Sequence, residues 1–171
     1  LELGATEFLA KPVDESELKI RVRNSLAFKV YQDRLANNDP LTGLPNRRVF
    51  VERLSAALAQ ANAQRRRLAV VQLNLDRFRQ VNDTLGHSVG DGVLRLVSAR
   101  LAGCLRESDT LARRGGDEFI VYRSGASVGT NVTSDAEAIL AAFKPTFEVM
   151  GEVLSTNVSI GLVASFEADD D

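Results

Sequence analysis

Residues 114–119 read Arg114-Gly115-Gly116-Asp117-Glu118-Phe119, and this stretch decides how the chain around it folds. Two short strand-like segments, residues 109–114 and 118–122, flank the pair of glycines. Glycine adopts the positive φ values that tight hairpin turns demand, so we predict that these segments pair as an antiparallel β-hairpin. The hairpin places two acidic side chains, Asp117 and Glu118, at its turn.

The segments on both sides of the hairpin alternate between the strand period and the helix period. Residues 68–75 predict a strand and residues 93–104 a helix. A helical stripe over residues 136–147 and an alternating strand over residues 158–162 follow the hairpin. The order strand, helix, strand, strand, helix, strand predicts an α/β (α+β) fold. This order is that of the ferredoxin-like βαββαβ fold, a palm-type antiparallel sheet with flanking helices. An extra helix over residues 50–61 precedes it here.

The chain before this unit reads as a connector. Residues 14–38 predict one long helix, with a leucine or valine every fourth residue from Leu18 to Val30. The stretch Asp39-Pro40-Leu41-Thr42-Gly43-Leu44-Pro45-Asn46 then breaks the pattern with two prolines and a glycine. We therefore expect a domain over residues 39–171 behind a helical linker that ends at residue 38.

Composition narrows the class of protein. With 44% hydrophobic and 26% charged residues the chain has the make-up of a globular protein, and general disorder is excluded. A net charge of −2 argues against a nucleic acid polymer as the main partner. A single cysteine, Cys104, excludes an internal disulfide. Because no run approaches the roughly 18 apolar residues of a membrane segment and no secretion signal is recognisable, we expect a cytoplasmic protein.

Oxygen-bearing side chains are expected to gather at one end of the predicted sheet. If residues 68–75 lie beside the hairpin, Asn74 and Asp76 approach the hairpin acids Asp117 and Glu118. Hard cations such as magnesium prefer carboxylate and carbonyl oxygens. The alternative is that Asp117 and Glu118 only decorate an exposed turn, and for an isolated glycine-glycine-acid tripeptide that is the commoner case.

Several motifs in order resolve this alternative. The intact signature at residues 114–119 stands with the stretch at residues 39–48, with Asp76-Arg77-Phe78-Arg79-Gln80-Val81-Asn82-Asp83-Thr84-Leu85-Gly86-His87, and with Gly90-Asp91. Together these resemble the GGDEF domains, which as active enzymes are diguanylate cyclases. The resemblance spans about residues 39–163.

The resemblance implies roles for individual residues. Asp117 and Glu118 match catalytic and metal-binding acids, and Asn74 with the carbonyl of Leu75 stands at the remaining metal positions, for Mg2+ or Mn2+. Asn82 and Asp91 match the substrate-binding residues that would read the guanine edge. The turn of Arg77, Phe78 and Arg79 matches the one that would hold the phosphates. The hairpin glycines Gly115 and Gly116 also match substrate-binding positions. Without the resemblance, a structural role for Asn82 and Asp91 is as good an explanation: Asn82 would form an Asx-turn and Asp91 would cap a helix.

The reaction implied is the condensation of two GTP molecules into cyclic diguanylate. Each domain would hold one GTP, so a homodimer supplies the proximity that the reaction needs. Arg106-Glu107-Ser108-Asp109 has the form RxxD and resembles the inhibitory site at which the product binds, with Arg113 as an additional contact. As a bare tetrapeptide it would more often be an ion pair at a helix end.

The chain departs from the family pattern in three places. Asn74 stands where the family has a metal-binding aspartate, so we expect weakened metal affinity and reduced or absent turnover. The usual carboxyl-terminal helix with its phosphate-binding lysine and arginine is missing. The third departure is at the amino end, where residues 4–26 resemble the tail of a response-regulator receiver, with Lys11-Pro12 at the characteristic position.

The motif around Asp76 also resembles that of GGDEF domains that precede an EAL phosphodiesterase domain.

Three readings follow from these features. The first is a diguanylate cyclase. The second is a catalytically degenerate GGDEF domain that binds GTP or cyclic diguanylate and regulates an attached output domain, which Asn74 favours. The third, a pure dimerisation element, leaves the retained guanine-binding and metal-binding residues unexplained.

Overall fold

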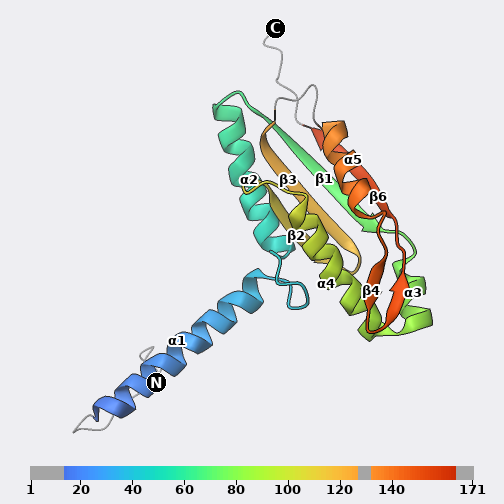
Figure 1. The fold of residues 1–171 in the computed structure, drawn as a ribbon. Coiled ribbons are helices and arrows are strands. Elements are labelled where there is room, and N and C mark those ends of the chain that lie inside the picture. Colours follow the sequence, from blue (N-terminus) through green and yellow to red (C-terminus); the bar gives the residue numbers. More distant parts are fainter. Residues whose placement is uncertain (1–13, 127–131, 165–171) are drawn as a thin grey trace. The chain divides into compact units, whose positions relative to one another are not determined.

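The computed structural model describes residues 14–126 and 132–164 (Figure 1). Its contacts divide the chain into two compact units, Leu1–Ala36 and Asn37–Asp171. The first part of the receiver-like segment, residues 4–13 with Lys11-Pro12, lies outside the described residues. None of the described helices is long and apolar enough to cross a membrane.

Helix α1, Glu15–Asn37, makes up nearly all of what is described of the first unit. It has no buried residue, and the ion pairs Lys19–Glu15 and Arg21–Glu17 link successive turns at 2.6 and 2.8 Å. Such exposed pairs one helical turn apart contribute a few tenths of a kcal/mol each, about 0.3–0.5. The single long helix predicted over residues 14–38 is present.

A four-stranded antiparallel sheet forms the second unit. Its strands are β1 (Arg67–Leu75), β2 (Thr110–Gly115), β3 (Glu118–Ala126) and β6 (Val158–Ala164), in the spatial order β2-β3-β1-β6. Strand β1 is therefore central and pairs with β3 on one side and β6 on the other. This is the predicted ferredoxin-like order, with the hairpin beside the first strand.

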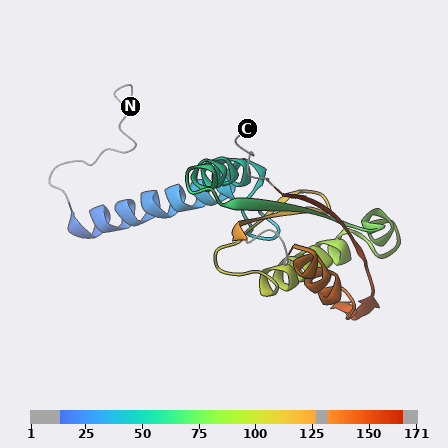
Figure 2. The ribbon, with the colours of Figure 1, turned by 90° about the horizontal axis from the view of Figure 1, so that it is seen from above.

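Helices cover both faces of the sheet (Figure 2). Helix α2, Arg47–Ala63, packs Phe50 and Ala61 against Ala112 and Tyr122 on one face. Helices α4 (His87–Gly103) and α5 (Val132–Ala142) lie on the other face, where the larger core is built. That core includes Leu73, Val93, Val97, Leu101 and Phe119, each at most 1% exposed. The alternation of the strands thus separates two apolar layers.

Two parts of the element pattern differ from the prediction. A short helix, α3 (Phe78–Leu85), precedes α4, which begins well before residue 93. Phe147, expected on the helical stripe over residues 136–147, instead begins strand β4 (Phe147–Val149), which pairs with β5 (Glu152–Leu154).

Proline explains why the helical stripe ends early. Pro145 has no backbone N–H and disfavours the helical conformation of Lys144, so α5 stops at Ala142. The chain beyond α5 is held by Arg100 of α4, whose guanidinium donates to the carbonyl of Pro145 at 2.6 Å and lies 3.6 Å above the ring of Phe147.

Candidate functional site

The β2–β3 hairpin closes through its two glycines. Gly115 and Gly116 have φ values of 125° and 54°, as the turn requires. Strand pairing sets Asn74 of β1 directly opposite Glu118 of β3, and the backbone N–H of Leu75 donates to the carbonyl of Asp117 at 3.3 Å. The structure therefore brings the end of β1 and the hairpin acids together, as the sequence predicted.

Asn74 and Asp117 face one another across this junction. The amide orientation that gives both polar ends of Asn74 a suitable partner points its nitrogen at Asp117, with 3.1 Å to Oδ2 and 3.3 Å to Oδ1. The opposite orientation would direct the amide oxygen at acceptors only. In that orientation an N–H group donates to a carboxylate, which is a favourable charge-assisted interaction.

The remaining acid at the end of β1 has a different partner. Asp76 accepts a hydrogen bond from the Ser159 hydroxyl of β6 at 2.6 Å, and its backbone N–H donates to the carbonyl of Asn157 at 2.9 Å. In the described part of the chain no group of three or more histidine, cysteine, aspartate or glutamate side chains is arranged to hold a metal ion. The predicted metal set combines the carboxylates of Asp117 and Glu118 with the Asn74 amide and the Leu75 carbonyl, which are oxygen ligands of the kind that a hard cation takes, and its role stays a prediction.

The turn after β1 is strained at one residue. Arg77 precedes helix α3 in the left-handed conformation, with φ 57° and ψ 24°. For a residue with a Cβ this costs roughly 1–2 kcal/mol, and such strain is concentrated at functional turns. Phe78 is buried, whereas Arg79 is 94% exposed and pairs with Asp83 at 3.7 Å.

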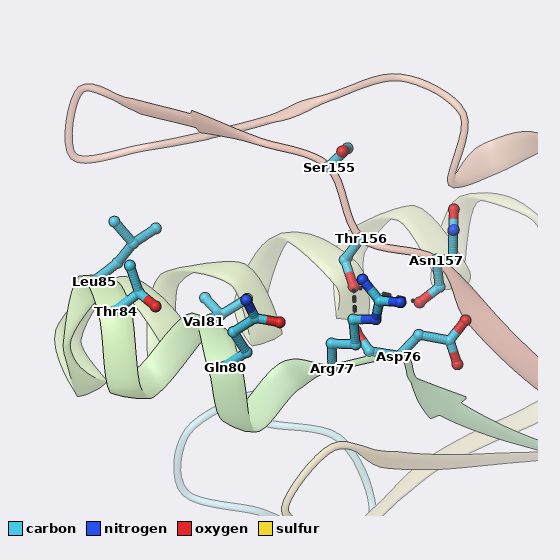
Figure 3. A pocket seen from close by; sticks show the side chains of 9 residues that line it. All are labelled: Asp76, Arg77, Gln80, Val81, Thr84, Leu85, Ser155, Thr156 and Asn157. Atoms are coloured by element: carbon cyan, nitrogen blue, oxygen red, sulfur yellow. Dashed lines mark hydrogen bonds between the residues drawn. The ribbon is translucent and has the colours of Figure 1, made fainter.

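A pocket of about 770 Å³ opens beside this turn (Figure 3). It lies between helix α3 and the segment that leads into β6. Thr156 donates to the carbonyl of Asp76 at 3.2 Å at its floor. The residues that line it are Asp76, Arg77, Gln80, Val81, Thr84, Leu85, Ser155, Thr156 and Asn157.

The two predicted guanine-reading residues lie on neighbouring helices, Asn82 on α3 and Asp91 on α4. The Oδ1 atom of Asn82 lies so close to Gly90 that an ideal Cβ built there would be 1.9 Å from it. Asp91 follows Gly90 on α4, so the amide and the carboxylate lie at one helix junction. Gly86, with φ 86°, makes the sharp change of direction between the two helices.

The predicted product site is already engaged within the chain. Asp109 has no exposed side-chain surface, and the guanidinium of Arg123 on β3 binds both of its oxygens, with Nε 3.0 Å from each and Nη2 2.5 Å from Oδ2. The backbone N–H of Arg106 also donates to Asp109, at 3.0 Å. Asp109 is thus a buried ion-pair partner, and its role toward a product stays a prediction.

Arg113, the third residue predicted there, is buried at a different contact. Its guanidinium binds the carboxylate of Asp39, and Nε and Nη2 donate to the carbonyl of Gly116 at 3.1 and 2.6 Å. Burial acts to raise the pKa of Asp39, but hydrogen bonds from Thr42 and Arg113 outweigh it and lower the pKa below its ordinary value.

Sequence reasoning missed three residues of this region. Asp39 belongs to the predicted helix-breaking loop, Arg123 lies just beyond the predicted strand 118–122, and Ser159 lies within the predicted strand 158–162 with no role assigned. The pairing register of β3 and β6 is what brings Arg123 to Asp109 and Ser159 to Asp76. Extending the predicted strand by one residue would have given a signal, because an arginine at the end of an apolar strand is rarely buried without an acidic partner.

The fold and the hairpin signature together define a GGDEF domain. The family model described as "Diguanylate cyclase, GGDEF domain" matches residues 36–171, and the chain belongs to this family. Diguanylate cyclases of this family generally use divalent metal ions, and the family binds GTP and cyclic diguanylate.

Named relatives and a solved structure agree with this assignment. The chain is 44% identical over 128 residues to the diguanylate cyclase TpbB of Pseudomonas aeruginosa PAO1, covering 74% of this chain and 29% of TpbB. It is 33% identical over 184 residues to the response regulator PleD of Caulobacter vibrioides NA1000, covering 96% of this chain and 39% of PleD. The chain therefore spans well under half of these relatives.

The structural comparison gives the same fold. A solved structure of the GGDEF domain of PA1120 (TpbB or YfiN) from Pseudomonas aeruginosa superposes with a TM-score of 0.73 at 43% identity, covering 75% of each chain.

Proposed function

We propose that this domain is a diguanylate cyclase-type domain that condenses two GTP molecules into cyclic diguanylate. The observation that carries the proposal is the intact hairpin at residues 114–119, seated beside the end of β1, together with Asn82 and Asp91 at one helix junction. The family membership of residues 36–171 supports it.

The guanine base is read at the junction of α3 and α4. The Asn82 amide offers a donor and an acceptor and the Asp91 carboxylate accepts, which complements a base edge that has both kinds of group. The phosphates lie toward the turn at Arg77, Phe78 and Arg79, where backbone N–H groups precede a helix. Gly115 and Gly116 keep the hairpin backbone free of side chains next to the substrate.

The chemical step joins two nucleotides held by two copies of the domain. The 3′-oxygen of each GTP forms a bond to the α-phosphorus of the other, the bonds from the α-phosphorus to the bridging oxygens break, and two pyrophosphates leave. The Glu118 carboxylate of each copy takes the proton of the attacking 3′-hydroxyl as a general base. A Mg2+ or Mn2+ ion would be held by Asn74, the Leu75 carbonyl, Asp117 and Glu118, and would neutralise charge on the phosphates of GTP.

A second function is favoured by one specific observation. Because an asparagine stands at position 74, the domain lacks one negative charge at the place where the family holds its cation. A domain that still binds GTP or cyclic diguanylate without turnover would act as a regulator of an attached domain, such as an EAL phosphodiesterase domain.

One experiment separates these functions. The chain and its Glu118→Gln variant are incubated with GTP and magnesium or manganese, the nucleotides are separated by chromatography, and GTP binding is titrated in parallel. Cyclic diguanylate that disappears with Glu118→Gln supports the cyclase. Bound GTP without product supports the regulator. Cyclic diguanylate is titrated in the same way, and binding of neither nucleotide overturns both functions.

A further inference from the structure

The RxxD motif ends on a carboxylate that is withdrawn from solvent. The side chain of Asp109 has no exposed surface, and that of Arg123, its partner on β3, is 9% exposed. The Nε atom of Arg123 lies 3.0 Å from both carboxylate oxygens, and Nη2 lies 2.5 Å from Oδ2. Hydrogen bonds between ionised groups are roughly twice as strong as neutral ones. Asp109 is therefore committed to a partner within its own chain.

The N–H groups that Arg123 presents are of the same kind as those of a guanine base. A guanine edge carries N1–H and N2–H side by side, and a guanidinium carries Nε–H and Nη–H in the same parallel arrangement. A carboxylate accepts either pair through its two oxygens. Arg123 thus occupies on Asp109 the place that the base of a guanine nucleotide would need.

The two ends of the motif differ in their access to solvent. Arg106 is exposed, and its backbone N–H donates to Asp109 at 3.0 Å. A ligand whose phosphate binds the Arg106 guanidinium therefore finds no acceptor for its base. The backbone of Arg123 cannot move aside, because it is paired with Ala69 of β1 in a strand that has neighbours on both sides. Only rotation of the Arg123 side chain frees Asp109.

We infer that Arg123 closes the RxxD motif to cyclic diguanylate by standing in for the guanine base. Arg123 and the ligand compete for the same two oxygens of Asp109, so that binding of one excludes the other. Cyclic diguanylate binds here only when the Arg123 side chain is released, and the closed motif protects the domain from feedback by its product. This inference concerns the regulation of the proposed function and rests on cyclic diguanylate as the ligand.

Calorimetric titration of cyclic diguanylate tests this competition. The unaltered chain is compared with Arg123→Met and with a double variant that also carries Arg106→Ala. We expect Arg123→Met to bind at least about tenfold more tightly than the unaltered chain, and the double variant to lose this gain. The matched control is Arg66→Met, which changes an exposed arginine just before β1 and should leave the affinity unchanged. Equal affinities of Arg123→Met and the unaltered chain, or a gain that persists in the double variant, would overturn the inference.

A second variant covers the case in which Arg123→Met does not fold. Arg123→Lys retains the positive charge, but an ammonium group lacks the planar fork of a guanidinium. The inference predicts that Arg123→Lys also binds cyclic diguanylate more tightly than the unaltered chain. If this variant folds and its affinity equals that of the unaltered chain, competition by the guanidinium is excluded.

Nuclear magnetic resonance of the arginine Nε–H groups follows the competition in the unaltered chain itself. Saturating cyclic diguanylate should speed the exchange of the Arg123 Nε–H with solvent, because the ligand displaces it from Asp109. Cyclic diguanylate that binds through Arg106 while the Arg123 Nε–H stays protected would contradict the inference. GTP is titrated in parallel, and its failure to bind counts against the cyclase proposal alone, because the RxxD motif uses none of the residues proposed to hold GTP.

Discussion

Arg113 and Asp39, 74 positions apart in the sequence, form an ion pair in which one guanidinium nitrogen lies 2.9 and 3.0 Å from the two carboxylate oxygens. The same guanidinium donates to the carbonyl of Gly116 in the hairpin turn. One side chain therefore fastens the loop that opens the second unit to the turn that carries Asp117.

Asp39→Asn is expected to destabilise the second unit by about 3 kcal/mol at neutral pH, because it leaves a buried guanidinium without its charged partner. Urea unfolding of the variant and the unaltered chain measures this. Asp33→Asn, an exposed acid on α1, is the matched control and should change little. An Asp39→Asn variant as stable as the unaltered chain would show that the pair contributes no net stability.

The same pair sets a pH dependence. The pKa of Asp39 is lowered in the folded state, so its stabilising contribution is present above the unfolded pKa and is lost as the pH falls through the folded value. We expect the urea concentration at the unfolding midpoint to decrease as the pH is lowered below about 4. This decrease should be less steep in Asp39→Asn, which has no carboxyl group to protonate at this position. Parallel acid profiles for the two proteins would contradict this.

Gly90→Ala tests the guanine-reading junction. The added methyl would meet Oδ1 of Asn82 at 1.9 Å and displace it, so we expect GTP binding to weaken by about tenfold or more, as when a ligand's hydrogen-bond partner is lost. Gly103→Ala on the same helix meets nothing within 4 Å and is the control. Titration of GTP against both variants measures the two affinities. Equal affinities would show that Asn82 does not contact the bound GTP.

Arg123→Met tests the buried partner of Asp109. We expect a loss of about 3 kcal/mol in the free energy of unfolding, because Asp109 keeps its burial and loses its cation. If the RxxD residues bind product, freeing Asp109 should also strengthen binding of cyclic diguanylate, measured by calorimetry. Arg95→Met replaces an exposed arginine and serves as the control. Unchanged stability in Arg123→Met would contradict the prediction.

Arg77 allows backbone strain to be separated from charge. Arg77→Gly and Arg77→Ala both remove the guanidinium, but only glycine relieves the left-handed conformation. We expect Arg77→Gly to be more stable than Arg77→Ala by about 1 kcal/mol, measured by thermal or urea unfolding. Equal stabilities would mean that the turn relaxes to another conformation.

The sequence could predict the parts of the fold that depend on local patterns. The alternation of residues 68–75 and the Gly115-Gly116 turn predicted Asn74 beside Asp117 and Glu118, given the ferredoxin-like strand order that sets the first strand beside the hairpin. Strands β4 and β5 were missed because three-residue strands carry too little periodicity. The pairs Asp39–Arg113 and Asp109–Arg123 could not be predicted, since they depend on how distant segments pack rather than on any local spacing.

The pairing of β1 with β3 has a consequence for folding fidelity. The register is interrupted between Arg67 and Leu68, at the end of the strand away from the hairpin, and then runs without a shift to Asn74 opposite Glu118. Because side chains alternate between faces, a slip of one residue would turn Asn74 to the opposite side of the sheet. A misregistered domain could thus remain compact yet fail to assemble the site, so ligand binding by this domain would report correct strand alignment rather than compactness alone.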